Sequence, residues 1–85
     1  MAEATRTATF VCFKAGGIKG VVATVSSFTT GDTCTFTSGD NGMTTLVWRH
    51  VHSATNDATI SNTFAGSTLT FQATGGVTHI FAIGF

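Results

Sequence analysis

The feature that most constrains the fold of this chain is the alternation of threonine with apolar residues. Stretches such as 33–37 (TCTFT) and 68–71 (TLTF) change polarity at every position. Because successive side chains of a β-strand point to opposite faces, a period of two predicts strands that are wet on one face. No window has the apolar spacing of a helix, and Thr, Val, Ile and Phe are strand formers. The pattern therefore predicts an all-β protein.

Glycine-containing turns divide this pattern into short segments. Gly, Asn and Asp, which tolerate a positive φ, cluster at 16–17, 30–32, 39–42, 65–67 and 75–76. Between these turns we expect strands near 5–14, 20–27, 32–37, 43–53, 57–62, 67–73 and 77–85. About seven short strands in 85 residues predict a single domain, a compact antiparallel β-sandwich or small barrel.

The chain also resembles itself after a shift of about 35 residues. The segment 23–37 (ATVSSFTTGDTCTFT) aligns with 58–72 (ATISNTFAGSTLTFQ), and Cys34 takes the position of Leu69. Glycine and apolar positions agree as well as threonines, which are common enough to match by chance. We therefore predict an internal duplication, with pseudo-repeats at about 20–53 and 54–85, and a pseudo-two-fold axis between them.

Charged residues are scarce and balanced, which excludes several classes of function. The formal net charge at pH 7 is zero, and the Lys+Arg set is limited to Arg6, Lys14, Lys19 and Arg49. Without a basic patch to neutralise phosphates, we expect no nucleic-acid binding. At 42% hydrophobic residues the chain is too apolar to be disordered. We also expect no membrane span and no secretory signal, because no apolar run is long enough.

The longer predicted strands differ from the short ones in having apolar side chains on both faces. One face forms the core, and the second needs a cover, either loops of the same chain or a partner protein. We favour a partner protein, because a domain this small buries only about 60% of its unfolded surface on its own. The candidate interface is one phase of the three long strands: Val11, Phe13, Val47, Val51, Phe81, Ile83 and Phe85.

Residues that could carry chemistry are few and scattered. His50 and His52 share one strand face and, with His79, reach the number of protein ligands in a catalytic zinc site. No Cys, Asp or Glu accompanies them at ligand spacing, so we predict no metal and no cofactor. Nucleophile and phosphate-loop motifs are absent from the sequence, and the acids fall in turns or at a terminus: Glu3, Asp32, Asp40 and Asp57. We predict that the protein is not an enzyme and has no catalytic residue.

The two cysteines, Cys12 and Cys34, both fall at apolar phases of their strands. Free cysteine behaves as a small buried hydrophobe, so we expect two buried, reduced thiols. A disulfide between them is the alternative, and it is less favoured because nothing indicates an oxidising compartment.

Three segments give the chain a resemblance to a known group of proteins. Residues 23–37 (ATVSS…GDTCTFT), 58–71 (ATISN…GSTLTF) and 77–85 (VTHIFAIGF) resemble small β-rich virion proteins of tailed bacteriophages, in particular capsid decoration (cement) proteins. The resemblance covers about residues 20–85. It implies a virion structural protein, assembled in the host cytoplasm, that binds the major capsid protein and copies of itself as a dimer or trimer. It assigns no catalytic residue, and the Pro-rich N-terminal arm of some such families is absent.

Other interpretations stay open at this point. A small ligand-binding module for carbohydrate or metal would use Trp48, Arg49, His50 and His52, a set typical of sugar stacking. Another head or tail component of a virion is a further alternative, as is a subunit of a bacterial surface filament. A glycan array or a zinc-dependent shift in melting temperature would separate the ligand-binding module from a structural protein.

Overall fold

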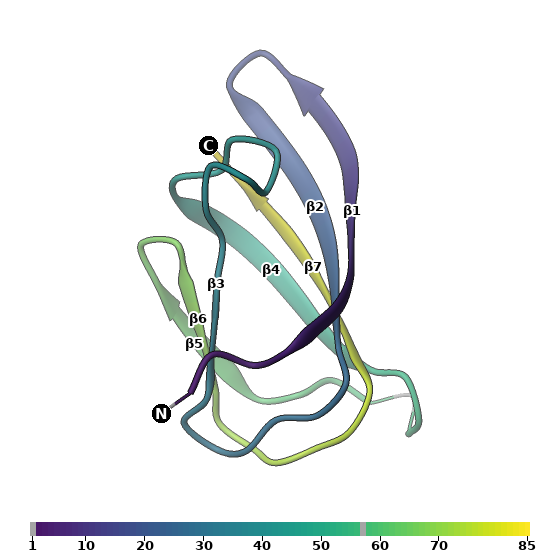
Figure 1. Ribbon diagram of the computed structural model, residues 1–85. Helices are drawn as coiled ribbons and strands as arrows, with labels where there is room; N and C mark the ends of the chain where they lie inside the picture. Colours follow the sequence, from purple (N-terminus) through teal and green to yellow (C-terminus); the bar gives the residue numbers. More distant parts are fainter. Residues whose placement is uncertain (1, 57) are drawn as a thin grey trace.

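The computed structural model describes residues 2–56 and 58–85, and within these ranges the chain forms strands and no helix. The strands are β1 (Arg6–Ala15), β2 (Ile18–Val25), β3 (Thr33–Thr35), β4 (Leu46–Ser53), β5 (Asn62–Ala65), β6 (Thr68–Phe71) and β7 (Thr78–Gly84). A four-stranded sheet has the order β1-β2-β7-β4, and a three-stranded sheet has the order β3-β6-β5 (Figure 1). These strands all pair antiparallel. The prediction of an all-β, antiparallel fold is confirmed. Since the described ranges are free of helix, they offer no helical membrane span.

One predicted strand, 57–62, differs from the structure. Residue 57 lies outside the described residues, and β5 begins only at Asn62. The preceding residues run beside β4 instead, where the Ser53 amide donates to the Ala58 carbonyl (2.8 Å) and the Ile60 amide donates to the Val51 carbonyl (2.9 Å). The chain then crosses to the smaller sheet as β5, so this segment joins the two layers at one edge.

A second crossing joins the two layers at the opposite edge. The Ala4 amide donates to the Thr33 carbonyl (2.8 Å), and the Thr33 amide donates to the Ala2 carbonyl (2.9 Å). After this pairing beside β3, the chain enters β1 of the larger sheet. The two crossings hold the sheets together as a sandwich that is not closed into a barrel.

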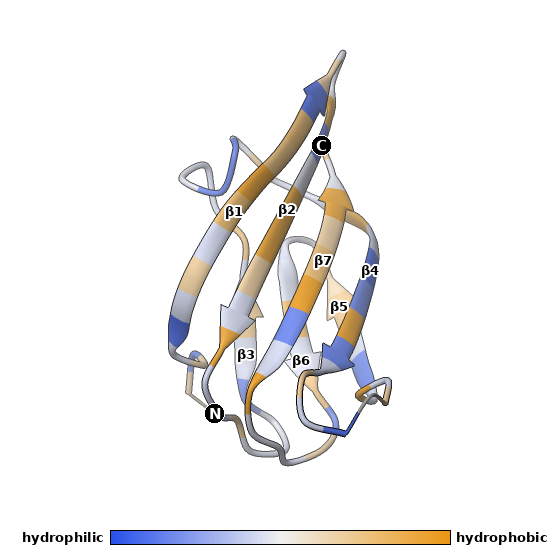
Figure 2. Ribbon diagram, turned by 90° about the vertical axis from the view of Figure 1, so that its right-hand side faces the viewer, coloured by the Kyte–Doolittle hydropathy of each residue, from blue (hydrophilic) through white to orange (hydrophobic). Residues whose placement is uncertain are grey.

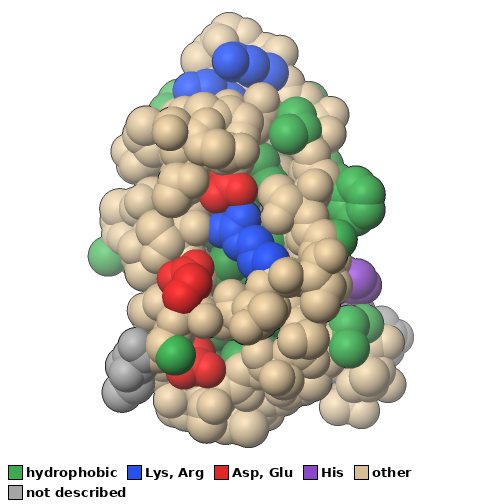
Figure 3. All heavy atoms as spheres, viewed as in Figure 1, with side chains coloured by type: hydrophobic (Ala, Val, Ile, Leu, Met, Phe, Trp, Pro, Cys, Tyr) green, Lys and Arg blue, Asp and Glu red, His purple; other side chains and the backbone are tan. Residues whose placement is uncertain are grey.

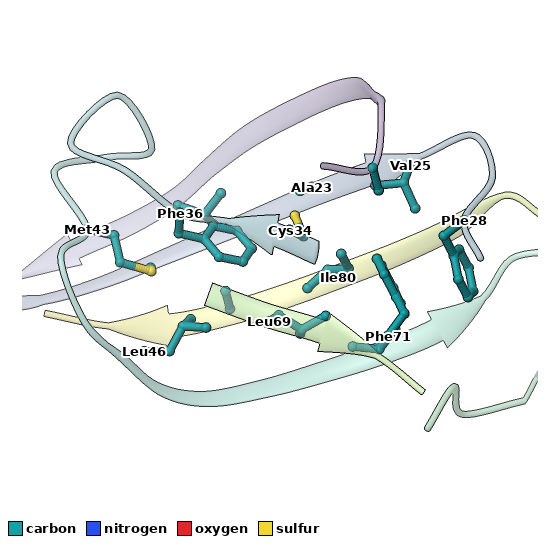
Figure 4. Packing of buried hydrophobic residues seen from close by; sticks show 14 residues of the cluster. Ala23, Val25, Phe28, Cys34, Phe36, Met43, Leu46, Leu69, Phe71 and Ile80 are labelled. Atoms are coloured by element: carbon teal, nitrogen blue, oxygen red, sulfur yellow. The ribbon is translucent and has the colours of Figure 1, made fainter. Parts of the chain in front are cut away.

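The core lies between the two sheets (Figure 4). Cys34 and Leu69 stand directly opposite each other in the β3–β6 pairing, and both are fully buried. The rings of Phe28 and Phe71 stack with centroids 4.1 Å apart. The larger sheet contributes apolar residues mainly from its two central strands, β2 and β7: Val21, Ala23, Val25, Ile80 and Ala82. This packing explains why each short strand alternates, since only one of its faces meets the core.

Two β-bulges decide which side chains of the long strands face this core. Apart from a shift at the start of β1, between Arg6 and Ala8, the pairing shifts by one residue between Val11 and Phe13 in β1, and between Leu46 and Trp48 in β4. An extra residue in one strand reverses the alternation beyond it. Leu46 and Val51 are therefore both buried, although they lie five positions apart. The prediction that Val51 belongs to the interface is wrong, because the bulge turns it into the core.

The two predicted pseudo-repeats share part of their architecture. Each contributes a short strand to the smaller sheet (β3, β6) and a long strand to the larger sheet (β4, β7), and both members of each set pair with each other. Phe36 and Phe71 are both buried, while Val25 is buried and Ile60 only partly so. The elements that open the two repeats differ, since β2 lies in the larger sheet and β5 in the smaller. An internal duplication stays a prediction.

Candidate functional site: the outer face of the larger sheet

The side of the larger sheet that points away from the core is defined by the strand register. Ile83 of β7 stands opposite Gly20 of β2 and Trp48 of β4. The next row of the same face is centred on Phe81, and β1 completes both rows. We call the outer face the residues of these two rows: Phe10, Phe13, Gly20, Val22, Trp48, His50, Phe81 and Ile83. Figure 2 looks onto this side of the sheet and shows hydrophobic residues along its strands.

The outer face is apolar, aromatic and accessible. Phe10 is 62% exposed, Trp48 46% and Phe13 39%, while Phe81 and Ile83 are half-buried between their neighbours. None of the residues of the outer face is Lys, Arg, Asp or Glu. Scattered single hydrophobic residues are normal on a protein surface, but a continuous patch of this kind marks an interaction site.

Local packing fixes the aromatic rings of the outer face. The ring of Phe13 lies against Gly20, in the space that a Cβ on that residue would need. The rings of Trp48 and Phe81 meet edge to face, with centroids 5.8 Å apart and an interplanar angle of 82°, a favourable geometry for two aromatic rings. Trp48 also stacks on His50, with centroids 6.2 Å apart.

A row of polar side chains follows the aromatic rows on the same side of the sheet. His79 of β7 pairs with His52 of β4 on one side and with Thr24 of β2 on the other. The Nδ1 atom of His79 and the Oγ1 atom of Thr24 share a hydrogen bond of 2.9 Å. The rings of His50 and His52 stack with centroids 5.6 Å apart. Among the described residues no three His, Cys, Asp or Glu side chains are arranged to hold a metal ion.

The proposed sugar-stacking set is divided between the two sides of the sheet. Trp48 and His50 lie on the outer face, but Arg49 points toward the smaller sheet. Its guanidinium lies 4.7 Å from the centroid of the Phe64 ring, and its Nε donates to Oδ1 of Asn62 (2.6 Å). Arg49 therefore joins the two layers and is not available beside the tryptophan.

The basic side chains of Arg6 and Lys19 are also held away from the outer face. Nη1 of Arg6 forms an ion pair with Oδ1 of Asp40 (2.6 Å), and the guanidinium lies over the Phe36 ring. Nζ of Lys19 donates to the carbonyl of Gly42 (3.1 Å). Figure 3, viewed at 90° to Figure 2, shows acidic and basic side chains adjoining one another in the middle of the view, while hydrophobic side chains gather along the margin nearest the larger sheet. The paired charges and the apolar outer face thus occupy different parts of the surface.

Of the predicted interface residues, the structure places three on the outer face: Phe13, Phe81 and Ile83. Val11 is 61% exposed but lies on the opposite face of β1, since its partner Val21 is buried. Val47 is the extra residue of the β4 bulge, and Phe85 follows the end of β7; both are 52% exposed.

Part of the outer face is not evident from the sequence. Phe10, Val22 and Trp48 belong to it, and the alternation assigned Phe10 and Trp48 to the core-facing phase. A bulge in each of β1 and β4 reversed that assignment. Nothing in the local sequence marks either bulge, because neither contains glycine. The two bulges become evident only from the register in which β1 and β4 pair with their partner strands.

The two thiols lie in different environments. Cys34 is buried as predicted, and burial raises the pKa of its thiol to about 11. Cys12 is exposed, so the prediction that it is buried is wrong, because it is the extra residue of the β1 bulge. Both thiols are free.

No pocket opens anywhere on the surface formed by residues 2–56 and 58–85, so the outer face is the candidate site. Concave, partly apolar clefts are the usual sites for small ligands, whereas a flat apolar surface is suited to another protein. Comparison with protein-family models, with curated proteins and with solved structures finds no match to this chain.

Proposed function

We propose that this chain is a non-enzymatic structural protein of a virion, a capsid decoration protein that stabilises a phage shell through protein–protein contacts. The observation that carries the proposal is the apolar outer face, which has no charged residue. Its partners in this proposal are the major capsid protein and copies of the chain itself. The protein joins the virion after assembly in the host cytoplasm.

The two sides of the molecule support an assembly role. On the side of the smaller sheet, the ions and hydroxyls bond within the chain, as Arg6 does with Asp40 and as Glu3 does with Thr33 and Thr35. Within the described ranges, every buried side-chain nitrogen or oxygen has a hydrogen-bond partner. The buried polar groups of that side therefore form their hydrogen bonds without a partner molecule. By contrast, the apolar side chains of the outer face are removed from water, which lowers the free energy, only when another apolar surface covers them.

The virion setting rests on the resemblance of residues 20–85 to decoration proteins. A protein that clamps shell subunits needs a small, stable body and an exposed contact surface, and it needs no reactive centre. The packed core and the apolar outer face support the first two of these requirements.

Co-sedimentation with empty phage shells tests the proposal. The shells are assembled from the major capsid protein encoded nearest to this chain in its genome. We expect the folded wild type to sediment with shells at a saturable, fixed ratio to capsid protein, and to raise the temperature at which the shells break. A folded protein that stays in the supernatant at all concentrations, or the lack of a neighbouring capsid gene, would count against it.

A carbohydrate-binding module is the second candidate, because Trp48 and His50 form an exposed stacked pair. Glycan-array binding that is lost in Trp48→Ala and kept in Val77→Ala, an exposed residue outside the outer face, would favour it over the structural role. The separation of Arg49 from this pair leaves the module with one fewer hydrogen-bonding group than the sequence suggested.

A further inference from the structure

We infer that the partner that covers the outer face is a second copy of this chain, with the two larger sheets packed face to face about a two-fold axis. The inference rests on the proposed function only in treating the chain as an assembly protein. It goes further in assigning the outer face to self-association, so that the dimer is the unit that binds a shell.

The charge distribution selects a second copy over a partner of different chemistry. The outer face has no Lys, Arg, Asp or Glu, and the net charge of the whole chain is zero. Two copies therefore approach without like-charge repulsion, while a charged partner surface would find nothing to pair with and would lose its hydration. A two-fold interface uses the same patch on both molecules, so a surface that needs no oppositely charged counterpart is suited to it.

The outward side of the larger sheet, which consists of the outer face and the polar row beside it, has an area sufficient for a specific dimer. Four strands spaced about 4.8 Å apart give a sheet about 19 Å wide, and eight residues extend about 26 Å along each strand. If the whole of this side is covered, each copy contributes about 500 Å² in projection, and a pair covers about 1,000 Å², the threshold for a biological interface. The outer face forms the apolar part of this area, about half of it, and side-chain relief adds to the total. Two sheets in contact lie about 10 Å apart, a separation that interdigitated Phe and Trp side chains fill.

The outer face is also organised before any partner arrives. Phe13 lies in the space left by Gly20, and Phe81 supports Trp48 edge to face. Rings already fixed by their neighbours lose little conformational entropy on association. Central aromatic anchors of this kind carry most of the affinity at protein interfaces.

Two neighbouring residues of β1 provide a matched test. Phe10 is on the outer face and 62% exposed, whereas Val11 is 61% exposed on the opposite face of the same strand. We expect the wild type to have the mass of a dimer in light scattering at micromolar concentration. Phe10→Asp raises the dimer dissociation constant at least tenfold, and Val11→Asp leaves it unchanged. Phe10→Thr, which keeps a strand-forming residue, has the same effect as Phe10→Asp and shows that the loss is not caused by unfolding.

Several outcomes would overturn the inference. A wild type that stays monomeric up to millimolar concentration would show that a second copy does not cover the outer face. An equal rise of the dimer dissociation constant in Phe10→Thr and Val11→Asp would show the same. The shell experiment separates this failure from failure of the proposed function. A monomer that still binds shells, and loses binding in Phe10→Thr, keeps the decoration role and assigns the outer face to the capsid protein. A stable dimer that ignores shells keeps the self-association and rejects the decoration role.

Discussion

At the scale of single residues, the alternation of the sequence places most side chains correctly and explains why some glycines are indispensable. Cys34 and Leu69 occupy equivalent core positions on adjacent strands, as their alignment in the sequence suggested. Glycine, however, has two uses that spacing alone does not separate. Gly66 adopts a positive φ of 60° in the β5–β6 turn, while Gly84 is required by the close approach of another backbone segment.

Two glycine substitutions should differ sharply in cost. A Cβ at Gly84 overlaps the carbonyl oxygen of Thr45, which is backbone and cannot turn aside, whereas a Cβ at Gly20 meets the movable ring of Phe13. We expect Gly84→Ala to destabilise the fold by about 3 kcal/mol or more and Gly20→Ala by about 1 kcal/mol. Urea unfolding measures both, and Gly17→Ala, where a Cβ makes only ordinary contact, is the control. Similar losses for the first two would show that β7 does not approach Thr45 so closely.

The two thiols should react at different stages. Cys12 is exposed and Cys34 is buried, so iodoacetamide should add one group to the native protein without prior reductant. A second group should appear only after denaturation, because alkylation needs an accessible thiolate. Intact-mass spectrometry counts the groups, and Cys12→Ser should abolish the first. A native protein that takes up no label until reductant is added would instead indicate a disulfide.

Alkaline pH should weaken the fold through Cys34. Burial raises the pKa of this thiol from 9.0 to about 11, so the unfolded chain ionises first as the pH rises. The contribution of the neutral thiol to the free energy of unfolding is fully present below pH 9. It falls by roughly 2 to 3 kcal/mol between pH 9 and pH 11. The free energy of unfolding of wild type should fall by this amount relative to Cys34→Val, which cannot ionise. Parallel pH profiles for the two proteins would contradict the assignment.

At the scale of elements, the bulges in β1 and β4 mark the limit of what the sequence can predict. The existence of every strand except β5, the antiparallel pairing and the buried phase of β2, β3, β6 and β7 follow from alternation and turn residues. The strand expected at 57–62 is instead β5, which begins only at Asn62. The faces of β1 and β4 do not, because one inserted residue reverses a period-two pattern and its position depends on the partner strand. This is why the alternation alone places Phe10 and Trp48, two of the eight residues of the outer face, in the core-facing phase.

Removing the β4 bulge should be far more harmful than removing its side chain. Val47 is the extra residue and is 52% exposed, so Val47→Ala should cost less than about 1 kcal/mol. Deleting Val47 forces either Leu46 or Val51 out of the core, and each loss is worth about 2 to 5 kcal/mol. Thermal unfolding of the two variants tests this, and a deletion that melts like Val47→Ala would mean that β4 has no bulge.

At the scale of the whole molecule, the distribution of polarity between the two sheets is the property that connects fold with function. The aromatic rows of the outer face occupy one side of the larger sheet (Figure 2), while the paired charges lie on a different part of the surface, seen in the view turned by 90° (Figure 3). A small chain gains stability when partners bury such a surface. The same asymmetry accounts for the absence of a pocket among the described residues, because a flat sheet offers contact area and not enclosure.

The fluorescence of Trp48 over a dilution series tests the central claim most directly. Trp48 is the single tryptophan of the chain and lies on the outer face, 46% exposed in one copy. If a second copy covers this face, emission is blue-shifted and shielded from acrylamide at high concentration, and it shifts to the red on dilution. Val11→Asp should reproduce that transition, and Phe10→Thr should show red-shifted emission throughout. Emission that is red-shifted and equally quenched at every concentration of the wild type would show that no second copy covers the outer face.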